Sequence, residues 1–482
     1  MNHSLIGLAG LGALPVVLAW FFYDRSMSSP GRNGSSPGRN GGSSVQVSSS
    51  RLRLLGGIVV VGLLSGGVGV PANAARNVSV RKKASNAKRV PVKPVPTQSP
   101  TPAAPIATVA TTTVAPTVPS TIAATLSPSS VAPAATGGAG PGTLISATPI
   151  TGAPAGTTGY KVRYRSVSLA GTPIEVTGLA YVPKAKAPAG GWPVLSYAHG
   201  TVGLADRCTP SNNISAIENT IAGAFAALGF AVVASDYEGL GTPGRHPYIV
   251  GVSEGRGVLD IVRAARAIPG ATVSNRFVTW GHSQGGHAAL FAGELAPTWA
   301  PDLKLLGVVA GAPPSHLTNV GDSVATSPFR GYMFMVAAGL QAADPTLNFN
   351  DVLTAKAQEI LPVVDTGCNS EVFAAFNKVP MDQLLVKDGL SRDPWKSALA
   401  ANEPGRTKTN APILIIHGDK DEQIPVETSA ALKKKLCALG NSVERKIYPG
   451  QDHGGAALAS LFEVTAWLSL RAAGLPATNA CS

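Results

Sequence analysis

The sequence predicts an α/β domain built on a doubly wound, mainly parallel β-sheet. Short, continuously apolar runs recur from Pro193 onward, and helical stretches separate most of them. Apolar strands with intervening helices are typical of a parallel sheet that is covered on both faces. The predicted strands of this kind are Pro193–Ala198, Phe230–Ser235, Phe277–Trp280, Leu305–Ala310, Ile413–Ile416 and Val443–Tyr448.

A β-hairpin is predicted ahead of these strands. Tyr160–Val167 and Ile174–Val182 alternate apolar and polar residues around Gly171, which is typical of an antiparallel pair at the edge of a sheet. With the hairpin included, Leu305–Ala310 is the sixth predicted strand.

The strand and helix alternation stops after this sixth strand, between Pro314 and about Arg406. The segment has helical stretches and no strand pair, and it follows the carboxyl end of a strand, where α/β sheets bind ligands. We therefore predict a helical cap over residues 315–406. Its Met and aromatic side chains, such as Met333, Phe334 and Met335, are interpreted as its core and not as a substrate lining.

Charge is distributed unevenly along the chain. The formal net charge is +12, but residues 1–140 hold 12 Lys and Arg with one acid, whereas the remainder holds 27 basic and 26 acidic residues. The basic balance therefore belongs to the leader and gives the predicted catalytic domain, residues 143–482, no nucleic-acid-binding face. Residues 75–142, basic at first and then rich in Pro, Thr and Ala, are predicted to be a disordered linker. The basic part of this leader could contact anionic lipid or the cell envelope.

Residues 1–74 are interpreted as a targeting region. Leu54–Val70 is an apolar run that two arginines precede and Ala72-Asn73-Ala74 follows, which predicts a secretory signal cut after Ala74. An earlier apolar run, Leu5–Phe22, keeps permanent membrane anchoring open as an alternative. Translation could start at Met1 or at Met27.

The stretch Arg276–Leu295 indicates a nucleophile elbow. A β-favouring run leads into Gly281-His282-Ser283-Gln284-Gly285, and a stretch rich in Ala and Leu follows, as expected for a strand, a sharp turn and a helix. The turn would expose the hydroxyl of Ser283 above the sheet and aim the backbone N–H of Gln284 at a developing oxyanion. A side chain at 281 or 285 would hold the strand and the helix apart.

A second Gly-x-Ser-x-Gly match, Gly251–Gly255, is rejected as an elbow. The segment between it and the preceding strand contains two prolines and cannot form the crossover helix that a parallel neighbour needs. Ser253 is interpreted instead as the N-cap of a helix over Val258–Ile268.

A serine nucleophile needs an imidazole base and a carboxylate that orients the imidazole. After Ser283, the strand ILIIHG is followed by Asp421, and His453 lies in a predicted loop beyond the last strand. The order Ser, acid, His fits the elbow type of hydrolase. Asp419, two residues earlier, remains a rival for the acid.

The second oxyanion donor is expected from the loop after Pro193–Ala198. We assign it to the backbone N–H of Thr201, and we interpret His199 as a residue that shapes this loop.

Four cysteines in an exported chain favour two disulfides, for which three pairings exist. By their places in the predicted domain we pair Cys208 with Cys368 and Cys437 with Cys481. No spacing typical of a metal site occurs among the cysteines and the scattered histidines.

Several motifs in this order together resemble the secretory lipase family of the α/β-hydrolase superfamily. They are AHGTVG, SDYEGLGTPG, GHSQGGHAALFAGELAP, VVAGAPP, HGDKDEQIP and PGQDHGG, and the similarity covers about residues 143–481. The resemblance implies the α/β-hydrolase fold with a helical cap. It also implies that Ser283, Asp421 and His453 are the catalytic residues and that Thr201 and Gln284 are the oxyanion donors.

The expected activity is hydrolysis of a lipid ester, as in a triacylglycerol lipase, through an acyl-serine and without a metal or cofactor. A short-chain carboxylesterase is the runner-up, and a catalytically silent surface-binding protein with this fold is the alternative from another class. The sequence predicts a secreted or cell-surface location and no oligomeric state.

Overall fold

The computed structural model describes residues 140–318 and 324–481. The predicted signal region, the alternative start at Met27 and nearly all of the predicted linker lie outside the described residues. No helix in the described part of the chain is both long and apolar enough to cross a membrane.

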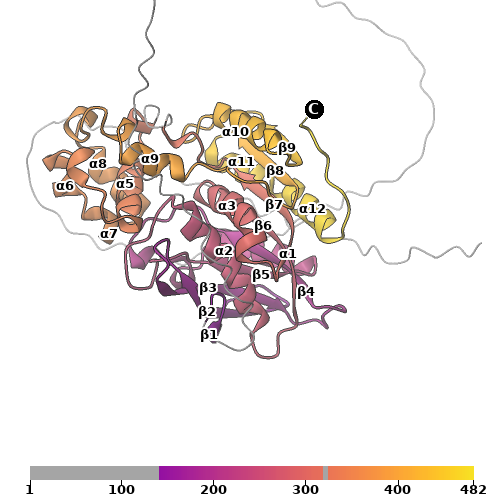
Figure 1. The fold of residues 1–482 in the computed structure, drawn as a ribbon. Coiled ribbons are helices and arrows are strands. Elements are labelled where there is room, and N and C mark those ends of the chain that lie inside the picture. Colours follow the sequence, from indigo (N-terminus) through magenta and orange to yellow (C-terminus); the bar gives the residue numbers. More distant parts are fainter. Residues whose placement is uncertain (1–139, 319–323, 482) are drawn as a thin grey trace, which may run out of the picture. The chain divides into compact units, whose positions relative to one another are not determined.

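Nine strands of the described chain form one sheet, in the order β1-β2-β3-β5-β4-β6-β7-β8-β9 (Figure 1). Strand β2 pairs antiparallel with β1 and with β3, and β3 pairs antiparallel with β5. From β5 onward the neighbouring strands, in the order β5-β4-β6-β7-β8-β9, all pair in parallel. The strands are β1 (Leu144–Ile150), β2 (Thr157–Val167), β3 (Pro173–Pro183), β4 (Trp192–Ala198), β5 (Ala231–Ser235), β6 (Val273–His282), β7 (Lys304–Gly311), β8 (Ile413–Gly418) and β9 (Val443–Tyr448).

The predicted strands are all present, but the predicted count was one too low. Strand β1 was not predicted; in it only Leu144, Ala147 and Ile150 are partly buried, and the other residues are exposed. An edge strand that packs one side chain in three lacks the alternation that identifies a strand in a sequence. The helical insertion therefore follows the seventh described strand and not the sixth.

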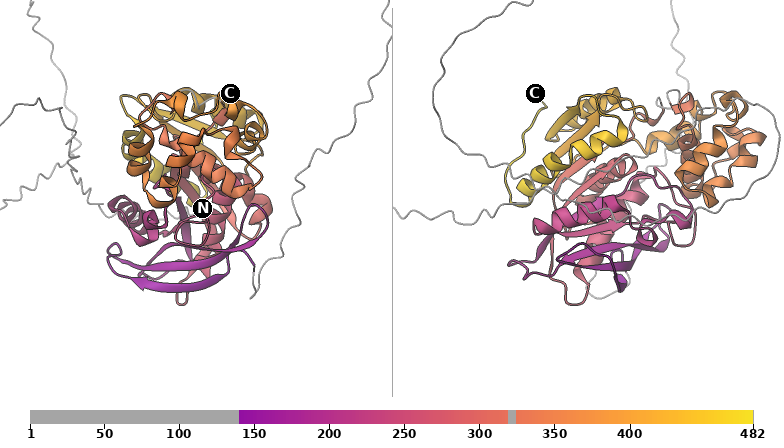
Figure 2. Two further views of the ribbon diagram at one scale, coloured as in Figure 1. Left: turned by 90° about the vertical axis from the view of Figure 1, so that its left-hand side faces the viewer. Right: turned by 180° about the vertical axis from the view of Figure 1, so that it is seen from behind.

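The helices that flank the sheet lie on both of its faces. Successive residues of each strand point to opposite faces, so every central strand packs against helices on both sides. Val194, Val233 and Phe277 pack on the side of α2 and α3, whereas Leu195, Val232 and Val278 pack on the side of α1 and α12. Both cores are thus drawn from the same strands. Figure 2 shows the ribbon of the sheet and its helices from two further sides. The helices are α1 (Ala216–Ala227), α2 (Gly251–Arg266), α3 (Gln284–Trp299), α10 (Val426–Ala438), α11 (His453–Ala459) and α12 (Leu461–Ala472).

The segment between β7 and β8 is helical and has a core of its own. Phe334, Met335, Phe376 and Trp395 are fully buried in it, and the rings of Phe334 and Phe376 stack with their centroids 3.7 Å apart. The expectation that Met and aromatic residues form this core is confirmed for Phe334 and Met335. The helices of this insertion are α5 (Gly331–Ala343), α6 (Ala355–Ile360), α7 (Val363–Thr366), α8 (Asn369–Phe376) and α9 (Trp395–Ala401).

Candidate active site

Ser283 occupies the turn between β6 and α3. Its backbone has φ 59° and ψ −125°, a conformation that costs free energy for a residue with a side chain. The surrounding structure holds it there, because the Ser283 N–H donates to the carbonyl of Gly311 at 2.8 Å and its carbonyl accepts from the N–H of His287 at 3.1 Å. The turn thus has the strained geometry of a nucleophile elbow.

The two glycines of the elbow leave no room for a side chain. A Cβ at Gly281 would lie 2.2 Å from the carbonyl oxygen of Gly285, and a Cβ at Gly285 would lie 2.0 Å from the carbonyl oxygen of Ala198. The close crossing of β6, α3 and β4 therefore requires glycine at both positions, for the steric reason that the sequence suggested.

Asp421 and His453 contact each other beyond the carboxyl ends of β8 and β9. Nδ1 of His453 lies 2.7 Å from Oδ2 of Asp421, and neither side chain is more than 7% exposed. His453 is the first residue of α11 and does not lie in a loop as predicted, because Asp452 caps the helix by accepting the N–H of Gly455 at 2.7 Å. The rival Asp419 accepts instead from the N–H of Gly450, at 2.6 Å.

The Asp421 carboxylate receives four hydrogen-bond donors. Oδ1 accepts the backbone N–H groups of Gln423 at 2.9 Å and of Ile424 at 2.8 Å, and Oδ2 lies 3.1 Å from Nε2 of His417 in addition to His453. Burial raises the pKa of this carboxyl group, but the hydrogen bonds from His417, His453 and Ile424 outweigh burial and hold the pKa well below its ordinary value. Asp421 is therefore ionised.

Nε2 of His453 is buried and has no hydrogen-bond partner among the described residues. Because Nδ1 faces a carboxylate, which only accepts, Nδ1 carries a proton, and Nε2 is the nitrogen left to take up the proton of a nucleophile. The ring of His282, the residue before Ser283, lies 4.6 Å from the His453 ring between centroids. Burial, with the nearby His453, lowers the pKa of His282 to about 3, so His282 is neutral.

The loop after β4 passes close to the elbow. A Cβ at Gly200 would lie 3.3 Å from the carbonyl oxygen of His282 and 4.0 Å from Cβ of Ser283. Thr201 follows, and its Oγ1 lies 2.8 Å from the hydroxyl of Tyr248. His199 is buried against the ring of Tyr237, with centroids 4.3 Å apart, and its Nδ1 lies 2.8 Å from the carbonyl oxygen of Gly200, as suits a residue that shapes the loop.

A buried polar network beneath the elbow was not identified from the sequence. Nε2 of Gln284 lies 2.8 Å from Oε1 of Glu254 and 2.8 Å from Nε2 of His246, and Nδ1 of His287 lies 3.1 Å from Oε2 of Glu254. Burial lowers the pKa of His246 to about 4, so the ring is neutral. Its Nδ1 lies 2.8 Å from the carbonyl oxygen of Glu238 and donates to it, so its Nε2 accepts the amide N–H of Gln284. Nothing in the sequence singled out Glu254, because Ser253 and Arg256 beside it make this part of α2 polar.

Ser253 lies apart from this arrangement, and its predicted role as an N-cap is wrong. Helix α2 begins at Gly251 with Val250 as its N-cap residue, so Ser253 is inside the first turn. Its hydroxyl donates to Oε2 of Glu238. The helix starts earlier than predicted because Asn402, a residue outside the helix, stabilises its first turn. Oδ1 of Asn402 accepts the N–H of Gly251 at 2.9 Å.

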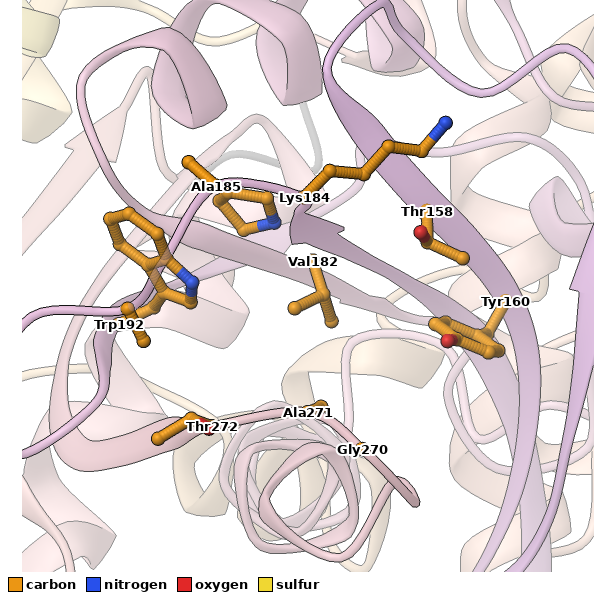
Figure 3. A pocket seen from close by; sticks show the side chains of 11 residues that line it. Thr158, Tyr160, Val182, Lys184, Ala185, Trp192, Gly270, Ala271 and Thr272 are labelled. Carbon is orange, nitrogen blue, oxygen red and sulfur yellow. The ribbon is translucent and has the colours of Figure 1, made fainter.

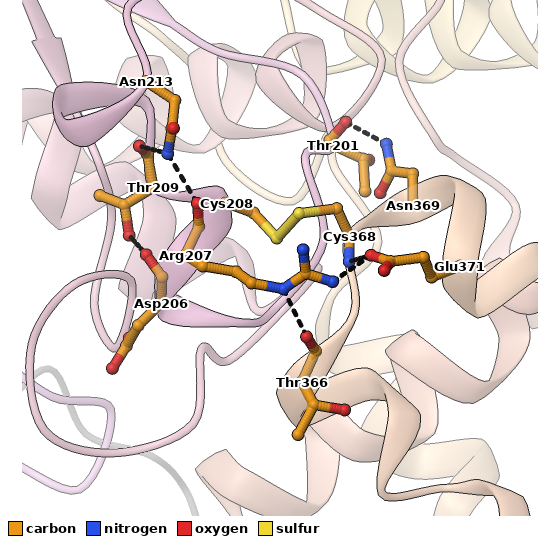
Figure 4. Close-up of a disulfide and its surroundings, with 10 residues drawn as sticks. All are labelled: Thr201, Asp206, Arg207, Cys208, Thr209, Asn213, Thr366, Cys368, Asn369 and Glu371. Carbon is orange, nitrogen blue, oxygen red and sulfur yellow. Dashed lines mark hydrogen bonds and ion pairs between the residues drawn. A yellow bond between two sulfur atoms is a disulfide. The ribbon is translucent and has the colours of Figure 1, made fainter.

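Both predicted cysteine pairs are present as disulfides. Cys208 and Cys368 join the loop after β4 to the insertion (Figure 4). Cys437 and Cys481 join α10 to the carboxyl-terminal segment. A hydrogen bond of 2.9 Å from the hydroxyl of Tyr332 in α5 to Oε1 of Gln423 brings the insertion to the Asp421 loop as well.

One pocket of about 270 Å³ lies at the other end of the sheet, between Trp192, Tyr160 and Thr272 (Figure 3). Trp192 is the first residue of β4, whereas the elbow lies beyond the carboxyl ends of the parallel strands, so this pocket is separate from Ser283. No group of three or more His, Cys, Asp or Glu side chains that could hold a metal ion occurs among the residues that the structure describes.

Residues 211–480, more than half of the chain, match the family model described as secretory lipase. The chain belongs to the secretory lipase family. The family is one of lipases, and the chain is 26% identical to Lipase A of Moesziomyces aphidis over 320 residues, which are 61% of this chain and 68% of that protein. It is 27% identical to a secreted triacylglycerol lipase of Malassezia globosa, over 58% of this chain and 65% of the relative.

Another relative of this chain is named differently. A protein of Mycobacterium tuberculosis named as a probable inactive lipase is 26% identical over 67% of this chain and 75% of its own length. Family membership alone therefore does not establish activity.

Solved structures show the same fold as this chain. Candida antarctica lipase A in its closed state matches with a TM-score of 0.62 and 23% identity, over 71% of this chain and 84% of that one. The rice cell wall degrading esterase LipA of Xanthomonas oryzae matches with a TM-score of 0.59 and 19% identity, over 70% and 98%. The fold is that of the α/β hydrolases.

Proposed function

We propose that this protein is an exported serine hydrolase that cleaves carboxylic esters of lipids, in the manner of a triacylglycerol lipase. The observation that carries the proposal is the contact between His453 and the ionised Asp421, which leaves the buried Nε2 of His453 unpaired beside the elbow that holds Ser283. This combination supplies a nucleophile, a base and an orienting carboxylate in the chain order of the α/β hydrolases.

The proposed reaction has two halves. The Oγ of Ser283 attacks the ester carbonyl carbon while Nε2 of His453 takes the hydroxyl proton, and the imidazolium that forms is stabilised by Asp421. The tetrahedral intermediate then expels the alcohol, which receives the proton from His453. Water, deprotonated by His453, attacks the acyl-serine in the second half and releases the carboxylic acid. No metal or cofactor takes part.

The backbone N–H groups of Thr201 and Gln284 are proposed to stabilise the oxyanion in both halves. Gln284 is the first residue of α3, so its N–H has no partner within the helix. The side chain of Gln284 is anchored on Glu254 and His246, which fixes the residue that donates. Donors that are already in place where negative charge develops are worth several kcal/mol in the transition state, about 3 to 4 for one donor in a serine protease.

The substrate class rests on the family and its relatives. A secreted triacylglycerol lipase is among the relatives, which favours a lipid ester. The insertion, proposed to be a cap over residues 315–406, contacts both the Asp421 loop and the loop that bears Thr201. A short-chain carboxylesterase is the second candidate, and the esterase from Xanthomonas oryzae shows that this fold also serves esterases.

Export is part of the proposal. The secretory family and two disulfides in the described chain favour an oxidising compartment outside the cytoplasm. We propose that a signal ending at Ala74 directs this export and that residues 143–482 form the catalytic domain. Contact of the basic leader with lipid or the cell envelope, and anchoring by the apolar runs, remain alternatives for its final location.

The test is hydrolysis of p-nitrophenyl esters of increasing acyl length and of emulsified triacylglycerol, with Ser283→Ala as the control. Activity that rises with acyl length and extends to the emulsion is expected of a lipase, whereas activity confined to short acyl chains identifies an esterase. An inactive wild-type protein that also fails to react with an alkyl phosphonate would reject the enzyme and favour a silent binding protein.

A further inference from the structure

The loop after β4 is held by the insertion as well as by the sheet. We call Gly200–Gly203 the oxyanion loop. The Nδ2 of Asn369, the first residue of α8, donates to the carbonyl oxygen of Thr201, and the N–H of Asn369 donates to the carbonyl of Val202 at 3.3 Å. Gly203 and Cys368 pair as an isolated antiparallel bridge. The oxyanion loop therefore forms a short backbone pairing with the start of α8 (Figure 4).

The contacts to Thr201 leave one of its polar groups free. Its hydroxyl is paired with the hydroxyl of Tyr248 at 2.8 Å, and its carbonyl is paired with Asn369. Its backbone N–H has no hydrogen-bond partner among the described residues. The side chain and the carbonyl of Thr201 are thus each held by a hydrogen bond, and together these two contacts set the direction of its backbone N–H. This N–H is the group that the proposed function assigns to oxyanion binding.

Asn369 is itself held in place, because neighbouring residues of the insertion are bound to Cys208 and Arg207. The preceding residue, Cys368, is bonded to Cys208, which lies beyond the oxyanion loop in the chain. Arg207 donates to the carbonyl of Thr366 at 2.6 Å and pairs with Glu371, which also accepts the N–H of Cys368 at 2.8 Å.

The close approach of the two segments is built into the backbone. Gly203 has φ 110°, and a Cβ there would lie 2.8 Å from Cα of Cys368. A larger residue would push the insertion away from the loop, so glycine is needed on both conformational and steric grounds.

We propose that Asn369 is a positioning residue of the oxyanion hole, by which the insertion holds Thr201 in the orientation that binds the transition state. The inference rests on the proposed function. It means that the insertion takes part in catalysis through the oxyanion loop in addition to covering the site. Substitution of a residue that only stabilises the fold would change the amount of active protein, whereas substitution of Asn369 should change the turnover rate of each active site.

The test compares two variants of Asn369 with a matched control. Asn369→Leu keeps the size but removes the donor, and Asn369→Asp replaces the donor by an acceptor that repels the Thr201 carbonyl. The control is Asn377→Leu, because Asn377 lies on the same insertion just beyond α8 and its Nδ2 donates to the carbonyl of Pro328 at 2.7 Å. Active sites are counted by titration with an alkyl phosphonate, so that misfolded protein does not enter the rate.

We expect both Asn369 variants to lower kcat per active site by about tenfold to a hundredfold, somewhat less than the loss of a whole oxyanion donor. KM on a soluble p-nitrophenyl ester should stay within about twofold, because the substrate carbonyl gains its full charge only in the transition state. The inhibition constant of an alkyl trifluoromethyl ketone, whose adduct with Ser283 bears an oxyanion, should rise in proportion to the loss of kcat/KM. Asn377→Leu should change none of these values by more than about twofold.

Two results would overturn the inference while leaving the function intact. One is an Asn369→Leu protein with wild-type kcat and wild-type affinity for the ketone, and the other is an equal loss in Asn377→Leu. A wild-type protein that hydrolyses no ester and is not labelled at Ser283 would instead reject the proposed function, and the role of Asn369 with it.

Discussion

His453 and Asp421 meet at 2.7 Å between Nδ1 and Oδ2, although 32 residues separate them in the chain. The contact fixes which nitrogen of His453 carries the proton. Since Asp419 is bound to the N–H of Gly450 by Oδ1, only one of the two neighbouring aspartates is paired with this imidazole.

Asp421→Asn is therefore expected to remove nearly all ester hydrolysis. An amide at this position favours the wrong tautomer of His453, and the corresponding change in a serine protease costs about 10⁴ in kcat. Asp419→Asn should lose less than about tenfold, since it weakens only a turn. The measurement is kcat on one soluble ester for both variants, and similar losses would leave Asp421 without its assigned role.

Ser283→Ala is expected to reduce hydrolysis by several orders of magnitude, because the nucleophile and its base act as a unit. Ser253→Ala is the matched control from the second Gly-x-Ser-x-Gly segment, and it loses only a hydrogen bond to Glu238. Mass spectrometry after phosphonate labelling should locate the label on Ser283. A label on Ser253 would contradict the assignment of the elbow.

The stability of the protein should depend on pH through His282. Its pKa of about 3 lies below the ordinary value of 6.5, so between these values the unfolded chain binds a proton that the folded chain does not. Lowering the pH from 6.5 therefore destabilises the fold, by up to about 1.4 kcal/mol per pH unit for this group.

His282→Asn should remove this contribution and flatten the fall of the unfolding free energy between pH 6.5 and 4.5. Urea unfolding with the disulfides intact measures it. His246, whose pKa is lowered to about 4, titrates in both proteins and serves as an internal background. Equal slopes in the two proteins would show that His282 is not held neutral by the fold.

The two disulfides should have different effects on activity. Replacing Cys437 and Cys481 together by Ser is expected to cost about 2 to 4 kcal/mol of stability and little kcat, because that bond fastens the carboxyl-terminal segment. Replacing Cys208 and Cys368 should cost a similar amount of stability and also lower kcat, because the bond between these two residues anchors the oxyanion loop. Non-reducing peptide mapping of exported protein should recover these two links, and four free thiols would contradict both the pairing and the export.

Local patterns sufficed to predict most of the sheet and the pairing of Asp421 with His453. The β2–β3 hairpin has an alternating sequence, and β4 to β8 have mainly apolar runs that are largely buried. The order of Ser283, Asp421 and His453 follows from which strand each one succeeds. The structure departs from the prediction where a local pattern is weak. Strand β1 is a mostly exposed edge strand, and α2 starts early because Asn402, from a distant part of the chain, holds its first turn.

The contacts around the site could not be predicted from the sequence, because they join residues far apart in it. Gln284 and Glu254 are 30 positions apart, and Thr201 and Asn369 are 168 apart. No spacing rule relates such pairs, since the insertion and the sheet are brought together by packing that only the folded chain defines.

The four cysteines pair in the order in which they occur, Cys208 with Cys368 and Cys437 with Cys481. On the proposed route of export the chain crosses the membrane amino end first, so each cysteine meets its correct partner as the next thiol to emerge. Oxidation in order of arrival would then yield the native bonds directly, so we expect this protein to mature with an oxidant and without an enzyme that reshuffles disulfides.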